Sequence, residues 1–366
     1  RGYFYGNPLL TSLTGIENID AQTIDSLSII GNSSLSTCDV QSICDYLASP
    51  NGSINIYGNA SGCNNPAEVA SNCGTTMPCL PYGNYYFLTQ SEIDNFQANF
   101  PGCNDLKGNV QIKGNDITSL EGLSQLTSVE GNLNIYDNPY LTNLSGLNTL
   151  STIGSSLNIF QNSMLTNLEG LNSLNSIGLK LYIDKNNSLT SLSGLDNLQS
   201  ILGSLYIGTW NNDTSNPILA DISALANIDG DSIGYLFISG NYSLSECAIK
   251  SICEYLAINY YADIWMNGEG CNNQEEVEQA CLVSVENIFE EKTILLFPNP
   301  ANKTVTIAYK NGLTISEVTI YNQTGQKVYR GIPENNTLDI SKLQPGMYVV
   351  EVATKEGNLR KKLIIQ

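Results

Sequence analysis

A repeat of 24 residues is the feature that most constrains the fold of this chain. It has three consecutive copies that align without gaps: NLNIYDNPYLTNLSGLNTLSTIGS (132–155), SLNIFQNSMLTNLEGLNSLNSIGL (156–179) and KLYIDKNNSLTSLSGLDNLQSILG (180–203). Less regular copies precede this region from Asn109 and follow it from Ser204. A unit this short cannot bury its own apolar face, so the copies must stack into an array with a continuous core.

The spacing inside each copy predicts a tight coil. Its L-x-I pair is typical of a short strand that points two side chains inward. The later apolar residues fall three apart without the alternation of three and four that a helix requires, and the Gly, Asn and Ser content disfavours long helices. An asparagine follows the strand in most copies, and we expect it to turn inward and bond backbone groups one coil away. These asparagines are Asn115, Asn138, Asn162, Asn186 and Asn241.

The ten cysteines form a four-residue module that occurs twice, with one further pair. CDVQSICDYL and GCNNPAEVASNC in the first module match CAIKSICEYL and GCNNQEEVEQAC in the second. The spacing lacks the short CxxC knuckles of zinc sites, so disulfides in an oxidising compartment are predicted. The modules are Cys38, Cys44, Cys63 and Cys73, then Cys247, Cys253, Cys271 and Cys281; the further pair is Cys79 and Cys103.

Each module allows three pairings, and we favour first-to-third with second-to-fourth because it ties a helix to a coil and to a terminal helix. A stacked array needs capped ends, and the second module is expected to supply the C-terminal cap. Residues 79–103, with SEIDNF as a helix, are expected to supply the N-terminal cap of a complete array over 79–281. Residues 1–78 are then the end and cap of an earlier array. Because Arg1 falls within a coil, that array is expected to be incomplete, after removal of a leader or as a fragment.

The pattern L-x-x-L-x-G-L-x-x-L-x-x-I-x-G-x-L-x-I-x-x-N with cysteine-tied caps resembles the receptor L domain family over residues 1–281. That resemblance implies a leucine-rich-repeat-like β-solenoid, as found in growth-factor receptor ectodomains and bacterial surface proteins. It also implies a binding module and not a catalyst. We therefore expect no enzymatic activity.

The C-terminal region has a different composition after a linker at 282–291. Residues from Lys292 onward contain ten Lys and Arg against five Asp and Glu, whereas the preceding residues contain six against 30. Short alternating strands separated by Gly turns predict a β-sandwich. The segments LFPNPA (296–301), VTIYNQTGQKV (318–328), LDISKLQPGMYVVEV (338–352) and the final KKLIIQ resemble the type IX secretion C-terminal sorting domain. This resemblance covers 292–366, with an immunoglobulin-like sandwich expected. It implies the type IX machinery as a partner and export to the outer-membrane surface or medium of a Gram-negative bacterium.

Composition excludes several function classes. The chain of 366 residues has no histidine, which removes Ser-His and Cys-His catalysis and His-ligated zinc. A net charge of −19 disfavours nucleic acid and anionic lipid as partners. There is no apolar run of 18 residues for a transmembrane helix, and no calcium-loop motif. We expect neither a metal nor a cofactor.

The predicted recognition surface is the outward side of the strands. The outward positions are Asn134, Tyr136, Asp137, Asn158, Phe160, Gln161, Tyr182, Asp184, Lys185, Tyr206 and Phe237. Their five aromatic residues predict a ligand surface for an extracellular protein or glycan. Cross-strand packing that stabilises the sheet would give the same pattern. The copy after Ser204 is longer than the others at GTWNNDTSNP (208–217), and this loop is expected to add Trp210 and Asp213.

Two other function classes remain open at this stage. A carboxylate-dependent enzyme acting on polysaccharide would need paired acids, and Asp137 and Asp184 are the acidic residues at neighbouring outward positions. No local motif distinguishes them from solvated surface carboxylates. A purely structural surface protein would lack an exposed aromatic stripe. The sequence favours a secreted recognition or adhesion protein over both.

Overall fold

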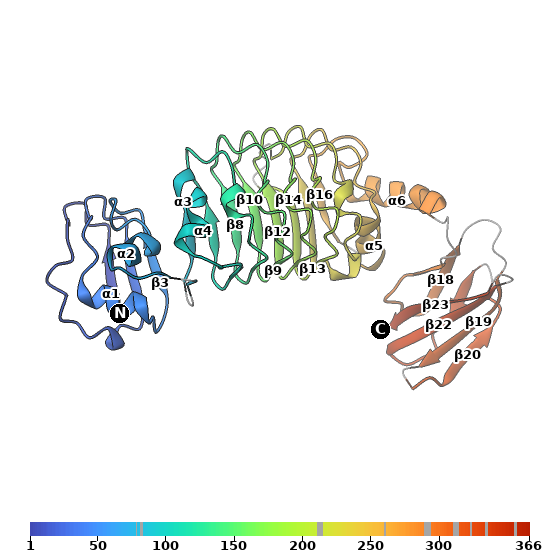
Figure 1. Cartoon of the computed structure of the whole chain (residues 1–366). Coiled ribbons are helices and arrows are strands. Elements are labelled where there is room, and N and C mark those ends of the chain that lie inside the picture. The colour runs from blue at the N-terminus through green and yellow to red at the C-terminus, as the bar shows by residue number, and fades with distance from the viewer. Residues whose placement is uncertain are drawn as a thin grey trace.

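The computed structural model describes residues 1–77, 79–80, 83–210, 215–259, 261–288, 294–309, 315–322, 324–333, 336–354 and 357–366. The fold is mainly β, as predicted. Figure 1 shows a short strand unit at the N-terminus, a long row of stacked coils and a C-terminal strand region. The first two contribute to one hydrophobic cluster, whereas the C-terminal region has its own.

The row of coils is built on one parallel sheet. Its strands follow one another in chain order, so each coil adds the next strand to the ladder. Partners lie one repeat apart, as in the pairing of Leu133 with Leu157 and of Leu157 with Leu181. The strands are β4 (Tyr85–Phe87), β6 (Val110–Ile112), β8 (Leu133–Tyr136), β10 (Leu157–Phe160), β12 (Lys180–Asp184), β14 (Ser204–Gly208), β15 (Tyr235–Ser239) and β16 (Asp263–Trp265).

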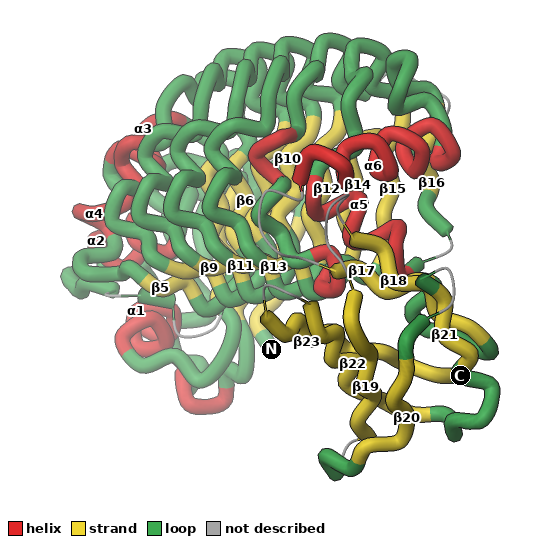
Figure 2. The backbone as a smooth tube through the Cα atoms, turned by 90° about the vertical axis from the view of Figure 1, so that its right-hand side faces the viewer, coloured by secondary structure: helices red, strands yellow, loops and turns green. Residues whose placement is uncertain are grey.

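A second ladder of two-residue strands lies on another side of the coils. It contains β5 (Asp105–Leu106), β7 (Ser128–Val129), β9 (Thr152–Ile153), β11 (Ser176–Ile177) and β13 (Ser200–Ile201), all parallel. Loops complete each coil, and Figure 2 shows them stacked beside one another. Short 3-10 turns interrupt these loops at η1 (Ala21–Thr23), η2 (Glu121–Leu123), η3 (Ser223–Leu225) and η4 (Gly230–Ser232).

The core consists of the repeated Leu and Ile side chains. In the coil from 156 to 179, the apolar residues of the repeat are all completely buried, namely Leu157, Ile159, Leu165, Leu168, Leu171, Leu174 and Ile177. The glycine of each L-x-G-L segment is fixed by the close approach of the preceding coil. Gly170 has φ +114°, and a Cβ there would lie 2.0 Å from the carbonyl oxygen of Leu144. Only glycine combines that conformation with that contact.

A ladder of buried asparagines closes the corner after each long strand. Asn162 donates to the carbonyl oxygens of Ile135 at 2.9 Å and Phe160 at 3.2 Å, and its own oxygen accepts from Asn138. The predicted inward role is thereby confirmed for Asn138, Asn162, Asn186 and Asn241. It is wrong for Asn115, which is exposed, because the corner of its coil is one residue shorter. The Gly114 backbone N–H there donates to Asn138 instead.

The N-terminal unit continues the same geometry. Its parallel strands are β1 (Gly2–Tyr5), β2 (Leu27–Ile30) and β3 (Ile54–Tyr57). A bridge joins Ile54 to Gly83, and the rings of Tyr57 and Tyr86 stack with centroids 3.8 Å apart. These contacts link the N-terminal unit to the long row, although β3 and β4 belong to separate sheets. The strand β3 of the N-terminal unit was not predicted from the sequence, because its segment INIYGN lies inside the cysteine module.

Helices flank the strands within the cysteine-tied segments. They are α1 (Gln41–Ala48), α2 (Pro66–Asn72), α3 (Gln90–Asp94), α4 (Phe96–Asn99), α5 (Lys250–Ile258) and α6 (Gln274–Ile288). The disulfides are Cys38–Cys63, Cys44–Cys73, Cys79–Cys103, Cys247–Cys271 and Cys253–Cys281. Both modules have the favoured first-to-third and second-to-fourth pairing. The predicted equivalence of the modules is confirmed.

Peptide mapping under non-reducing conditions is expected to recover these five pairs and no free thiol. The Cys247–Cys271 bridge closes a separation of 24 residues between two completely buried side chains. Replacing both by Ala should lower the free energy of unfolding by about 3 kcal/mol. Finding Cys247 linked to Cys253, or free, in the secreted protein would contradict the duplicated-module interpretation.

The C-terminal region has two antiparallel sheets. One has the order β17 (Ile294–Phe297), β18 (Thr304–Tyr309), β21 (Thr337–Asp339). The other has the order β20 (Lys327–Gly331), β19 (Ile315–Asn322), β22 (Gly346–Thr354), β23 (Gly357–Ile365). Both contribute to one apolar core that includes Ile307, Ile320 and Val350. The short alternating strands were predicted from the sequence.

Candidate ligand-binding surface

The outward side of the long strands carries the predicted aromatic residues in two registers. Tyr136 pairs with Phe160, and Phe160 with Asp184. Tyr182, Tyr206 and Phe237 lie in another row, two residues earlier along their strands, where Asn134 and Asn158 precede them. The predicted single row is thus two rows: the first has its rings on β8 and β10, and the second has its rings on β12, β14 and β15. The pattern steps diagonally across the sheet.

The rings are nevertheless close enough to form one continuous path. Tyr136 and Phe160 stack with centroids 4.7 Å apart and an interplanar angle of 8°. Phe160 lies 6.0 Å from Tyr182, and Tyr182 lies 6.5 Å from Tyr206. These four side chains are half-buried. They form a partly exposed apolar strip in which successive ring planes make angles of 8°, 56° and 69°, and aromatic pairs at such separations attract one another.

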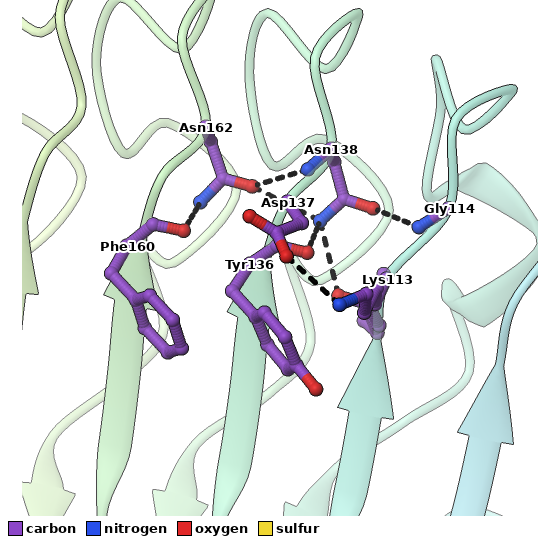
Figure 3. A network of polar contacts seen from close by, with 8 residues as sticks. Lys113, Gly114, Tyr136, Asp137, Asn138, Phe160 and Asn162 are labelled. Atoms are coloured by element: carbon purple, nitrogen blue, oxygen red, sulfur yellow. Dashed lines mark hydrogen bonds and ion pairs between the residues drawn. The ribbon is translucent and has the colours of Figure 1, made fainter.

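The buried asparagines lie next to Tyr136 and Phe160, the first two rings of this strip. Figure 3 shows Tyr136 and Phe160 side by side, with Asn138 and Asn162 at the ends of their strands. Lys113 Nζ forms an ion pair with Asp137 at 2.8 Å and lies 4.8 Å from the centroid of the Tyr136 ring. Asp137 has φ +52°, as Gln161 and Lys185 have φ +59° and +54° at the same corner of the following coils. The hydrogen bonds of the buried asparagines therefore fix the end of each strand, and with it the position of the outward aromatic side chain.

Asp184 differs from its predicted outward position. It is buried, and its two oxygens accept hydrogen bonds from the Tyr182 hydroxyl at 2.8 Å and the Ser215 hydroxyl at 2.7 Å. Burial, with Asp184 as acceptor, raises the pKa of Tyr182 well above its ordinary value. The prediction that Asp184 faces solvent is wrong, because the long loop after β14 returns over it through Ser215. Asp184 instead orients Tyr182.

Trp210 and Phe237 have opposite exposure. Trp210 is 54% exposed, whereas Phe237 is completely buried. The Trp210 ring lies 4.3 Å from the Phe237 ring, and Trp265 contacts Phe237 edge-on at 6.2 Å. The prediction that Phe237 is an exposed anchor is therefore wrong; it supports Trp210 from below. Asp213, predicted beside Trp210, lies outside the described residues.

A shallow depression occupies the centre of this surface. Its volume is about 480 Å³, and its walls include Lys180, Tyr182, Ser204, Tyr206 and Trp210. Lys180 Nζ lies 4.9 Å from the Tyr182 centroid and 5.8 Å from the Tyr206 centroid. Burial lowers the pKa of Lys180. An aromatic wall, an ammonium group and a hydroxyl group together can bind a ligand that is apolar on one side and polar on the other.

Sequence reasoning missed several residues of the surface. Lys180 stands one place before L-x-I, and Tyr235 occupies the same place in its own coil, pairing with Ser204. The Tyr235 ring lies 5.5 Å from Tyr206 and 6.5 Å from Trp210. Tyr261 and Trp265 extend the aromatic side chains onto the last coil, where the Tyr261 hydroxyl donates to Asp263 at 2.5 Å. Counting the first position of each copy as an outward position would have found Lys180 and Tyr235.

Comparisons with protein families match two parts of the chain. The Receptor L domain model matches residues 102–194, which contain most of the regular coils. The Secretion system C-terminal sorting domain model matches residues 295–366. Residues 102–194 are thus similar to the receptor L domain. The C-terminal region is a secretion sorting domain. A comparison with curated proteins gives no match.

The sorting domain identifies the route by which the protein is exported, which is type IX secretion. The protein is therefore secreted or displayed at the cell surface, and its sorting domain interacts with the type IX machinery. No helix among the described residues is long and apolar enough to cross a bilayer. The receptor L domain indicates a binding role. The matched residues contain Tyr136, Phe160 and Tyr182 of the aromatic surface, and Tyr206 and Trp210 follow them in the chain.

Proposed function

We propose that this protein is an extracellular recognition or adhesion protein of a Gram-negative bacterium, without enzymatic activity. Its receptor L domain-like solenoid, capped by disulfide-tied modules, would bind protein or glycan through the strand face. Its C-terminal domain, an immunoglobulin-like sandwich in this proposal, would direct it to the outer-membrane surface. The observation that carries the proposal is the continuous path of partly exposed rings from Tyr136 to Trp210.

The shape and chemistry of the surface support binding over catalysis. A few aromatic anchors commonly dominate an interface, because they bury much area with little loss of rotamer entropy. Asp137 and Asp184, the acids considered for a hydrolase, each have their own partners. Asp137 pairs with Lys113, and Asp184 accepts from Tyr182 and Ser215. The surface therefore offers apolar contact area more than reactive groups.

The double variant Tyr182→Ser, Tyr206→Ser is expected to abolish binding to ligands found in a glycan and protein array. Each anchor should contribute about 2 kcal/mol, so the affinity should fall by about a thousandfold. The single variant Trp210→Ala, at an exposed position, should weaken binding without loss of folding. Arrays and melting temperature measure the two effects separately.

The matched control is Tyr140→Ser with Tyr242→Ser. Both tyrosines are exposed, at 56% and 48%, and both follow the asparagine ladder instead of lying on the strand face. This control should bind as the unchanged protein does. Undiminished binding by the double variant and by Trp210→Ala would show that the aromatic surface serves only to stabilise the sheet.

A further inference from the structure

Lys180 is a half-buried cation within the aromatic surface. It lies at the start of β12, and its ammonium group is near the rings of Tyr182 and Tyr206. Trp210 and the hydroxyl-bearing Ser204 belong to the same depression. The ammonium group is therefore next to ring faces on which the apolar side of a ligand could rest.

Three lysines of the coils have carboxylate partners, whereas Lys180 and Lys185 have none among the described residues; of these two, Lys180 is the one that lies over aromatic rings. Lys107 pairs with Glu130, Lys113 with Asp137 at 2.8 Å, and Lys250 with Glu254 at 3.9 Å. The partner Asp137 raises the pKa of Lys113, whereas burial lowers that of Lys180. A partly desolvated charge without a counter-ion is unfavourable. An anionic ligand group beside Lys180 would remove that cost.

The placement of this lysine is selective in a chain with few cations. The residues before Lys292 contain only six Lys and Arg against 30 Asp and Glu. Two of these six, Lys113 and Lys180, lie over aromatic rings of the strand face. Charge complementarity at this point favours a ligand with a negative group next to an apolar face.

The shape favours a chain of sugar rings over a folded protein partner. The aromatic residues lie on successive coils, which are spaced about 4.8 Å apart, so they form a linear track across the sheet. The side chains of Tyr136, Phe160, Tyr182 and Tyr206 are half-buried, and the depression beside Tyr182 and Tyr206 is shallow. The side-chain amides of Asn134 and Asn158 border the track. Aromatic side chains can stack against sugar rings, and the neighbouring amides can form hydrogen bonds with sugar hydroxyl groups, so this surface suits a polysaccharide.

We propose that this surface binds a polysaccharide that contains uronic acid units. A sugar carboxylate would pair with Lys180, and the neighbouring sugar rings would stack on Tyr182, Tyr206 and Trp210. This inference rests on the proposed binding function and specifies its ligand class. The net negative charge of the coils opposes such a ligand at long range, but screening limits that repulsion to about 8 Å at physiological ionic strength. An ion pair between a sugar carboxylate and the Lys180 ammonium group is shorter than this screening distance, so its attraction is retained.

The experiment measures binding of the full chain to polygalacturonate by affinity electrophoresis and calorimetry. Fully methyl-esterified polygalacturonate serves as the uncharged probe with the same backbone. The buffer contains EDTA at physiological salt, so that calcium cannot bridge carboxylates. Lys180→Met, which keeps the aliphatic length, should weaken binding of the acid form by about tenfold. Lys180→Arg should retain most of the affinity, and Lys250→Met controls for the loss of one charge.

The ester probe should bind more weakly than the acid form and with equal affinity to the unchanged protein and to Lys180→Met. Equal binding of acid and ester by the unchanged protein would overturn the inference, as would an unaltered affinity in Lys180→Met. Absence of binding to polygalacturonate would also overturn it. The proposed binding function would still stand if the unchanged protein bound a neutral glycan or a protein and the Tyr182→Ser, Tyr206→Ser variant did not. Loss of all ligand binding by the strand face would reject both.

Discussion

Deletion of residues 292–366 is expected to abolish export while leaving the coils folded. The sorting domain matches 295–366, and its apolar core is separate from the cluster formed by the coils and their caps. Removing it therefore exposes none of the buried Leu and Ile side chains of the repeat. The truncated protein should accumulate in the periplasm, with little or none at the cell surface or in the medium.

Cell fractionation with surface proteolysis measures this effect. Non-reducing peptide mapping of the trapped protein tests whether its Cys253–Cys281 bridge has formed, which shows that the last cap is folded. A fluorescent protein fused to residues 282–366 is the complementary test, and it should reach the surface. If the truncated chain appeared at the surface as efficiently as the full chain, the sorting role would be rejected.

Replacing Asn162 by Ala is expected to cause the largest loss of stability from a single substitution in the coils. The side chain is completely buried and forms hydrogen bonds with Ile135, Phe160, Asn138 and Asn186. Without it, the Ile135 carbonyl and the Asn138 backbone N–H have no partner in a site closed to water. Leaving such groups unsatisfied should lower the free energy of unfolding by about 3 kcal/mol or more.

Chemical denaturation followed by circular dichroism measures this loss. The control is Asn148→Ala in the preceding coil, since Asn148 is exposed and its replacement should change stability by less than about 0.5 kcal/mol. Ligand binding on the strand face should weaken together with stability in Asn162→Ala, because the same residue fixes the end of β10. Equal stability of the two variants would contradict the structural role of the ladder.

The repeat predicted most of the fold because its information is local. Inward positions such as Leu157 and Ile159 follow from a spacing of two within the strand, and the tight corner follows from Asn162 at a fixed distance after it. The duplication of the cysteine modules predicted that both copies have the same pairing, and the structure shows that it is the favoured one. The sorting domain was predicted from segments that match its whole length. These features depend on neighbours in sequence or on an exact internal copy.

The sequence predicted the aromatic surface less completely. Tyr182 and Tyr206 were placed correctly on the outward side, because alternation within a strand decides that. Asn115 was misplaced, since a coil one residue shorter moves Gly114 into the corner. The third strand of the N-terminal unit, β3, was concealed within the cysteine module. For Asn115 the local pattern gave the residue type, and the shorter corner of its coil altered its position.

By itself, the sequence determined the coil, its core and the route of export, and it left three disulfide pairings open in each cysteine module, of which one was favoured. Only the tertiary structure decided which outward residues are accessible. Phe237 is buried because Trp210 and Trp265 cover it, and Asp184 is buried because Ser215 returns over it from a loop 31 residues later. Lys180 became a candidate ligand contact only when its ring neighbours and its lack of a carboxylate among the described residues were visible. Exposure depends on side chains from other coils and loops, which no spacing within one repeat can specify.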